Sequence, residues 1–447
     1  MSNFSRRSFL DYTLKAATGF AGASMLGRLG EMQAFAAGGS NYKALVCVFL
    51  NGGNDGHNTI VPMATAQQNY AQYATARQTM AISQGQLLPV AVGADSYGLH
   101  PSLVEVQNLY NQGKVAMLAN VGSLVTPITR QQFLAKSAPI PDSLFSHSNQ
   151  ANQWQAGRGD DFATTGWGGR AADLMQSMNA PSQFPMVLAT GEGGLYSVGA
   201  ATAPSIVPPG GALGLNSTSL TSRTTAFQQL IAFDSGVQLM QASNQITQRG
   251  ANDSLLLKNA LNSATPVQTV FPGSQLGQQL KQVASVMSVR GSLGMNRQIF
   301  FVSIGGFDTH GSQLPIQAAL LQDVSQCLAA FYQATIELGI EEAVTTFTNS
   351  EFGRTLQSSS GGGTDHAWGG HQIILGGAVK PGLYGTFPTL ALAGPDDANN
   401  RGTLIPTTSV EQYGATLAKW FGVPAASMAS VFPTVGNFAS QDLGFML

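Results

Sequence analysis

Short apolar runs alternate along the chain with segments of helical periodicity. In the clearest run, YKALVCVFL at residues 42–50, the apolar residues are continuous rather than alternating with polar ones. This pattern is typical of a strand that is buried on both faces of a sheet. We therefore predict buried strands at residues 42–50, 114–123, 183–190, 298–306, 342–350 and 371–377.

The segments between these runs predict helices near residues 67–80, 168–178, 316–339 and 408–422. In the last segment, Thr408 and Glu411 have the spacing of a capping box. Alternating strands and helices favour an α/β fold with a mostly parallel sheet and helices on both faces.

The region from about residue 195 to residue 282 has a different composition from the rest of the chain. It is rich in Ser, Thr, Ala and Gln and contains the Pro/Gly cluster APSIVPPGGALG. We interpret this region as an insertion or cap over the sheet rather than as a second independent domain.

Composition narrows the range of functions. Only 10% of the residues are charged, against about 25% in an average protein, and a neutral polar surface fits a protein outside the cytosol. The net charge of -2 and the lack of a basic cluster after the first 30 residues argue against nucleic acid as a partner. Both cysteines, Cys47 and Cys327, lie in apolar or helical patterns, which predicts buried thiols rather than a disulfide.

The first residues predict an export signal. The stretch SRRSFL contains Arg6 and Arg7, a weakly apolar segment follows, and AFA at residues 34–36 offers a cleavage site. This is the pattern of a twin-arginine signal, although a basic amphipathic helix is an alternative. We expect residues 1–36 to be removed by the twin-arginine translocation machinery, leaving a periplasmic or secreted protein of residues 37–447. No later stretch reaches the roughly 18 apolar residues of a membrane span.

Polar clusters follow the predicted strands at the points where the strands end. Ligands of doubly wound sheets bind at the carboxyl ends of the strands, so these clusters are candidate site residues. A carboxylate near an imidazole suits a divalent cation such as Zn or Mn. Taken singly, each cluster also fits a polar turn, a strand end or a helix start. The clusters are Asp55 with His57, Asp308 with His310, Glu351 with Arg354, and Asp365 with His366 and His371.

Several motifs resemble an exported family known only as domain of unknown function 1501. In order along the chain they are FLNGGNDGHNTIVP, YGLHPSL, GWGGR, GGFDTHGSQ, SEFGRT and GTDHAWGGHQIILGG. That family is similar to the alkaline phosphatase superfamily of phosphatases, sulfatases and phosphomutases. The resemblance implies an alkaline-phosphatase-like α/β fold and one or two divalent ions, of Zn, Mn, Mg or Ca.

The resemblance also implies the residues of the site. The implied metal ligands are Asp55, Asp308, His310, Glu351 and His366. The superfamily's later Asp-His pair falls at SEF, where this chain has a glutamate followed by Phe352. The position of the superfamily's nucleophile falls at His147, between Ser146 and Ser148.

The implied chemistry uses this nucleophile position and nearby arginines. His147, or Ser148 activated by it, would attack the ester or transfer a proton. Arg354, together with Arg130 or Arg158, would hold an anionic substrate unless these arginines form only surface ion pairs.

Two functions of different class follow from these expectations. The first is an exported metal-dependent hydrolase of small phosphate or sulfate esters. The second is a superfamily member without catalysis that serves as a periplasmic or cell-surface binding protein.

Overall fold

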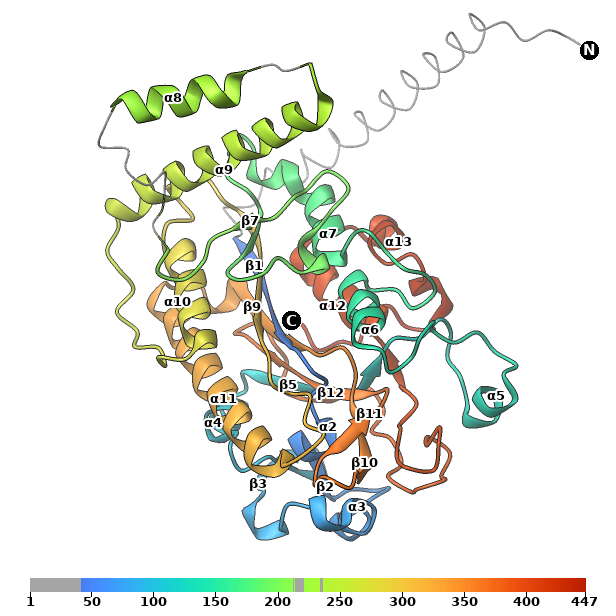
Figure 1. Cartoon of the computed structure of the whole chain (residues 1–447). Helices are drawn as coiled ribbons and strands as arrows, with labels where there is room; N and C mark the ends of the chain where they lie inside the picture. The colour runs from blue at the N-terminus through green and yellow to red at the C-terminus, as the bar shows by residue number, and fades with distance from the viewer. Residues whose placement is uncertain (1–41, 212, 214–220, 234–235) are drawn as a thin grey trace, which may run out of the picture. The chain divides into compact units, whose positions relative to one another are not determined.

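The central sheet of the protein contains nine strands in the order β13-β5-β12-β9-β1-β8-β6-β7, with β14 paired to β5 (Figure 1). The structure is a computed structural model that describes residues 42–211, 213, 221–233 and 236–447. The predicted export signal, residues 1–36, lies outside the described residues. The strands of this sheet are β1 (Lys43–Leu50), β5 (Val115–Gly122), β6 (Val187–Ala189), β7 (Ser205–Ile206), β8 (Arg297–Ile304), β9 (Val344–Asn349), β12 (Gly370–Leu375), β13 (Gly382–Tyr384) and β14 (Thr408–Ser409).

The sheet is mostly parallel, as predicted. β1 lies between β8 and β9 and runs parallel to both, with Leu45 opposite Ile299 on one side and Thr345 on the other. β12 is antiparallel to its neighbours β5 and β9. All six predicted strands are present, because continuous apolar runs mark strands that are covered on both faces.

Helices cover both faces of the sheet, which confirms the predicted α/β class. Figure 1 shows α4, α10 and α11 on one side of the sheet and α7 and α12 on the other. The helices are α2 (Gly56–Thr59), α3 (Tyr70–Arg77), α4 (Val104–Asn111), α5 (Arg130–Ala135), α6 (His147–Ala156), α7 (Trp167–Met175), α8 (Thr221–Ala232), α9 (Gln238–Asn262), α10 (Gln275–Ser288), α11 (Gln313–Glu337), α12 (Val410–Phe421) and α13 (Met428–Val431).

Two smaller sheets flank the ends of the central strands. One contains β2 (Ile60–Ala64), β3 (Leu88–Val92) and β4 (Asp95–Leu99), and the other pairs β10 (Arg354–Ser358) with β11 (Thr364–His366). The second pair matters for the site, because it places Arg354 directly opposite His366.

The start of α12 differs from the prediction by one residue. Ser409 is the N-cap, and its side chain forms a capping box with Gln412. Thr408 and Glu411 were predicted to form this box, which is wrong because the helix begins at Val410 and so places Ser409 and Gln412 at the N-cap and N3 positions. The rest of the helix matches the predicted pattern.

The region at residues 195–282 holds β7, α8, α9 and the start of α10. β7 extends the edge of the central sheet, and α10 packs on β8. Whether this region acts as a cap stays a prediction. Among the described residues, no helix is both long and apolar enough to cross a membrane.

The core surrounds β1 and β8, whose side chains are almost all buried. Phe49 and Phe301 from these two strands pack with ring centroids 6.0 Å apart. Cys47 and Cys327 are buried free thiols, as predicted. Burial of this kind provides the rigid support from which the loops after the strands project.

Candidate metal centre

The predicted site residues lie in loops at the carboxyl ends of three adjacent strands. Asp55 follows β1, Asp308 follows β8, and Glu351 follows β9. Because these strands are neighbours and parallel, their last residues point to the same edge of the sheet.

Gly52 allows the loops after β1 and β8 to approach each other closely. Its φ of +118° is a conformation that only glycine adopts readily, and a Cβ there would lie 2.2 Å from the Asp308 nitrogen. The Gly52 nitrogen donates to Glu351 Oε1 at 2.8 Å, and its carbonyl accepts from Arg354. One glycine thus joins the loops of all three strands.

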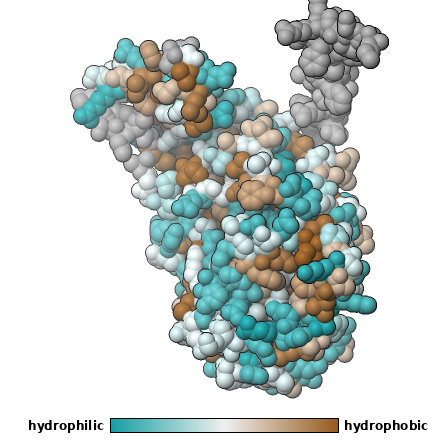
Figure 2. All heavy atoms as spheres, turned by 45° about the vertical axis from the view of Figure 1, so that its right-hand side comes forward, coloured by the Kyte–Doolittle hydropathy of each residue, from teal (hydrophilic) through white to brown (hydrophobic). Residues whose placement is uncertain are grey.

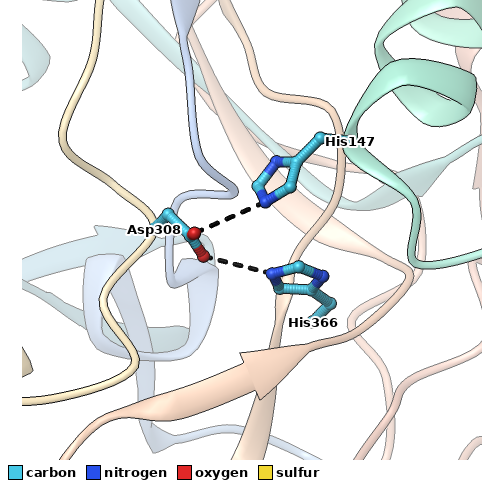
Figure 3. A group of neighbouring side chains, drawn as sticks. All are labelled: His147, Asp308 and His366. Atoms are coloured by element: carbon cyan, nitrogen blue, oxygen red, sulfur yellow. Dashed lines mark hydrogen bonds and ion pairs between the residues drawn. The ribbon is translucent and has the colours of Figure 1, made fainter.

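Three side chains from separate segments converge beside these loops. Figure 3 shows His147, Asp308 and His366 pointing toward one another, and their ligand atoms lie within 4.8 Å of each other. His147 is the first residue of α6, and His366 is the last residue of β11. A carboxylate and two imidazoles in this arrangement could hold a metal ion.

The ring of His147 is oriented by a buried carboxylate. Its Nδ1 lies 2.9 Å from Oε1 of Glu351, whose side chain is only 4% exposed. Since a carboxylate accepts hydrogen bonds, the proton of the neutral ring belongs on Nδ1. The lone pair of Nε2 then faces Asp308 Oδ2, at 3.5 Å.

The ring of His366 is oriented by the backbone. Its Nδ1 lies 2.8 Å from the carbonyl oxygen of Phe145, which can only accept, so Nδ1 carries the proton. Phe145 has a φ of +72°, a left-handed conformation that is rare for a bulky residue. The lone pair of His366 Nε2 faces Asp308 Oδ1, at 3.1 Å.

His310 completes the group from the loop after β8. Its Nε2 lies 3.0 Å from Asp308 Oδ1 and 3.0 Å from His366 Nε2. Its Nδ1 lies 3.5 Å from the carboxylate of Asp365, which in turn pairs with Arg401 at 2.7 Å. Every histidine of the group therefore has Nδ1 near an oxygen and Nε2 near Asp308.

This geometry fits a divalent cation. With neutral rings, the Nε2 lone pairs of His147 and His366 face a carboxylate, and these three groups repel one another unless a positive charge lies between them. The side chains of His147, Asp308 and His310 are 41%, 44% and 48% exposed. A cation held there would remain accessible to a small molecule from solvent.

Arg354 forms an ion pair with Asp308 and holds its carboxylate in place. Its buried guanidinium donates to Asp308 and to the carbonyls of Gly52, Gly53 and Thr364. Partial burial acts to raise the pKa of Asp308, but the hydrogen bond and the positive charge of Arg354 outweigh it and lower that pKa below its ordinary value. Through these contacts Arg354 positions Asp308. That Arg354 also binds an anionic substrate stays a prediction.

Asp55 makes different contacts from the other predicted ligands. Its carboxylate pairs with the buried Arg77 and accepts hydrogen bonds from the Gln313 side chain and from the backbone nitrogen of His57. It also caps the short helix α2. The metal cluster itself is formed without Asp55, whose assignment as a ligand stays a prediction and would require that it leave Arg77.

Ser148 and the two further predicted arginines bind nearby groups of the chain. Ser148 is exposed, and its hydroxyl oxygen lies 3.2 Å from the hydroxyl oxygen of Ser146 and 3.2 Å from Oδ1 of Asn149. Arg158 forms an ion pair with Asp160. Arg130 donates to the loop at residues 397–400.

His57 and His371 are both buried. Their rings meet edge to face, with centroids 5.8 Å apart. Burial lowers the pKa of each to about 3, so both are neutral near pH 7. A role as a cation at neutral pH is therefore excluded for both.

The sequence carried little sign of Arg77, Gln313 or the Phe145 carbonyl as parts of the site. Arg77 and Gln313 lie in helices, where a polar side chain usually faces solvent, and a backbone carbonyl leaves no residue-type signal at all. A cavity of about 670 Å³ lies elsewhere, lined mainly by α9, by residues 182–186 and by residues 201–207, which include β7, and none of the predicted site residues lines it.

Comparison with solved structures gives several similar chains of low identity. PsFucS1 sulfatase from Pseudoalteromonas sp. has a TM-score of 0.34 at 9% identity, over 88% of this chain and 70% of that chain. The lipoteichoic acid synthase LtaP from Listeria monocytogenes has a TM-score of 0.31 at 9% identity, over 83% and 76%. Phosphonate monoester hydrolase of Agrobacterium radiobacter has a TM-score of 0.31 at 9% identity, over 86% and 74%. Similarity at this level does not identify a function.

Comparison with curated proteins gives no match. A family model, described as protein of unknown function (DUF1501), matches residues 42–414. The match covers both the central sheet and every residue of the candidate metal centre. The chain therefore belongs to the DUF1501 family.

Proposed function

We propose that the chain is an exported, metal-dependent hydrolase of phosphate or sulfate esters. The observation that carries the proposal is the convergence of His147, Asp308 and His366, whose ligand atoms lie within 4.8 Å of one another. Imidazole and carboxylate ligands that are partly open to solvent suit a catalytic metal, which needs a free coordination position.

The residues around the cluster have distinct tasks in this proposal. A divalent cation, when bound, would polarise the ester oxygen and lower the pKa of a bound water. Glu351 and the Phe145 carbonyl keep the rings of His147 and His366 turned so that their Nε2 atoms face the cation. Arg354 keeps Asp308 ionised and in position.

Charge supports an anionic substrate once the cation is present. Arg354 and Arg401 contribute +2 and Asp308, Glu351 and Asp365 contribute -3, which sums to -1 with neutral histidines. A divalent cation changes this sum to +1, and the site would then attract an anionic ester. The choice of phosphate or sulfate esters rests on the motif resemblance.

One observation favours a second candidate, a metal-binding protein without catalysis. Arg354 is fully buried and donates to four acceptors of the chain itself, so it is not free to bind a substrate anion. Both candidates share the metal site and differ only in turnover.

Turnover of aryl phosphate and aryl sulfate by the metal-loaded protein tests the proposal. We expect hydrolysis of p-nitrophenyl phosphate or sulfate that a chelator abolishes and that Zn or Mn restores. Asp308→Asn and His147→Ala should each lower the rate by at least about 100-fold. Asp442→Asn is the matched control, since Asp442 is 41% exposed and also pairs with a cation, and it should leave the rate unchanged. Bound metal without turnover of either ester would support the second candidate instead.

A further inference from the structure

The helices α8 and α9, with Phe233 between them, form a helix pair that exposes large apolar side chains. No described residue of α8 is buried. Figure 2 shows hydrophobic side chains gathered on the lobe at the top of the view, where this helix pair lies. Exposed fractions of 49–80% are found at Leu230, Phe233, Leu239, Met240 and Ile246. A patch of this kind on a water-soluble surface marks an interaction site.

The exposed charges on the described residues of the helix pair are all basic. Arg223, Arg249 and Lys258 are exposed, whereas Asp253 is buried and accepts from Ser205. Asp234 lies outside the described residues. The surface of the pair therefore combines apolar side chains with positive charge.

We propose that the helix pair binds an anionic lipid surface. Apolar side chains of a surface helix insert into the boundary between headgroups and acyl chains, and nearby Lys and Arg attract the lipid phosphates. Ile246 and Arg249 also line the cavity of about 670 Å³, so the surface continues from the exposed face into a recess.

Charge disfavours a second copy of the chain as the occupant of this surface. In a two-fold dimer the same patch faces itself, so the basic residues Arg223, Arg249 and Lys258 of one copy would face the basic residues of the other. Juxtaposed like charges oppose such an association, whereas a surface of lipid phosphates relieves them. Lipid binding is independent of the proposed hydrolase activity.

A tryptophan placed on the helix pair would report its surroundings. The described native tryptophans are all buried, so their emission changes little on binding: Trp154, Trp167, Trp368 and Trp420. We expect the emission of full-length Phe233→Trp to shift to shorter wavelength with vesicles that contain phosphatidylglycerol and not with pure phosphatidylcholine. Salt at about 1 M, where the screening length is about 3 Å, should reverse the shift.

Two further variants serve as controls. Val270→Trp carries its reporter at an exposed apolar position after α9, so its emission should not shift. Adding Leu239→Glu to Phe233→Trp should abolish the shift. The N-terminal residues are the same in all variants. Vesicle binding through those residues would therefore not produce an emission shift that is seen in Phe233→Trp alone.

The outcomes separate the occupants of this surface. Emission of Phe233→Trp that ignores anionic vesicles, or that responds equally to neutral ones, would overturn the proposal. A shift that grows with protein concentration in the absence of vesicles would show that a second copy covers the helix pair, and would overturn it as well.

Discussion

Asp55 and Arg77 form an ion pair in which both side chains are almost fully buried. Asp55→Asn would leave Arg77 buried without an opposite charge, which costs about 3–5 kcal/mol. We expect that loss in the free energy of unfolding measured with urea, while the folded fraction keeps its metal. Asp160→Asn, which breaks the more exposed pair with Arg158, should cost at most about 1 kcal/mol. A variant that keeps its stability and loses its metal would instead support the predicted assignment of Asp55 as a metal ligand.

Glu351 acts on the metal centre through His147. Glu351→Gln keeps an acceptor for the His147 Nδ1 proton but removes the negative charge that makes the ring a stronger ligand. We expect the affinity for Zn to fall by about 10–100-fold, measured by competition with a chelating dye. Glu342→Gln, at an exposed glutamate paired with Lys114, is the control. Equal affinities for both variants would argue against a positioning role.

The sequence located most of the residues that meet at the site, but not the contacts that support them. The sequence predicts a residue of this site where a polar side chain lies at or near the end of a strand, since ligands bind at the carboxyl ends of strands. This holds for Asp308, His310, Glu351 and His366. Arg77 could not be found in this way, because it reaches Asp55 from a helix 22 residues away. Pairing of this kind depends on how the helix packs, which the local pattern does not record.

At the scale of the element, the sequence predicts the long strands but not the shortest ones. Long buried strands such as β1 and β8 carry a continuous apolar run, and these were predicted. β7 and β14 have two residues each and could not be, since two residues define no pattern. The error at α12 has another cause: Thr408 with Glu411 and Ser409 with Gln412 both have capping-box spacing, so the local pattern does not decide between them.

The start of α12 should respond to pH through Glu411. Burial raises the pKa of this carboxyl to about 7 from its ordinary 4.5, despite the hydrogen bond that Thr434 donates to it. The folded chain thus binds more protons than the unfolded chain between these values, and its stability from this group falls as pH rises through the window. We expect Glu411→Gln to lessen the fall in Tm between pH 5 and pH 8. A pH profile of Tm identical to that of the wild type would contradict the assignment.

For the molecule as a whole, the proposal of export rests on the low content of charged residues and on the paired Arg6 and Arg7. Replacing these two arginines with lysines keeps the positive charge but removes the pair that the twin-arginine machinery reads. We expect the precursor to accumulate in the cytosol, measured by cell fractionation and by the size of the chain. Export of this variant at the normal level would contradict the assignment.

The proposed function of the whole molecule requires a cation among His147, Asp308 and His366. Metal content of the protein, purified without chelator and measured by plasma mass spectrometry, tests this most directly. We predict about one divalent ion per chain, lost in His147→Ala and His366→Ala and retained in Asp442→Asn, with cooperative unfolding in every case. A wild-type protein that contains no divalent metal and takes up neither Zn nor Mn would contradict the account.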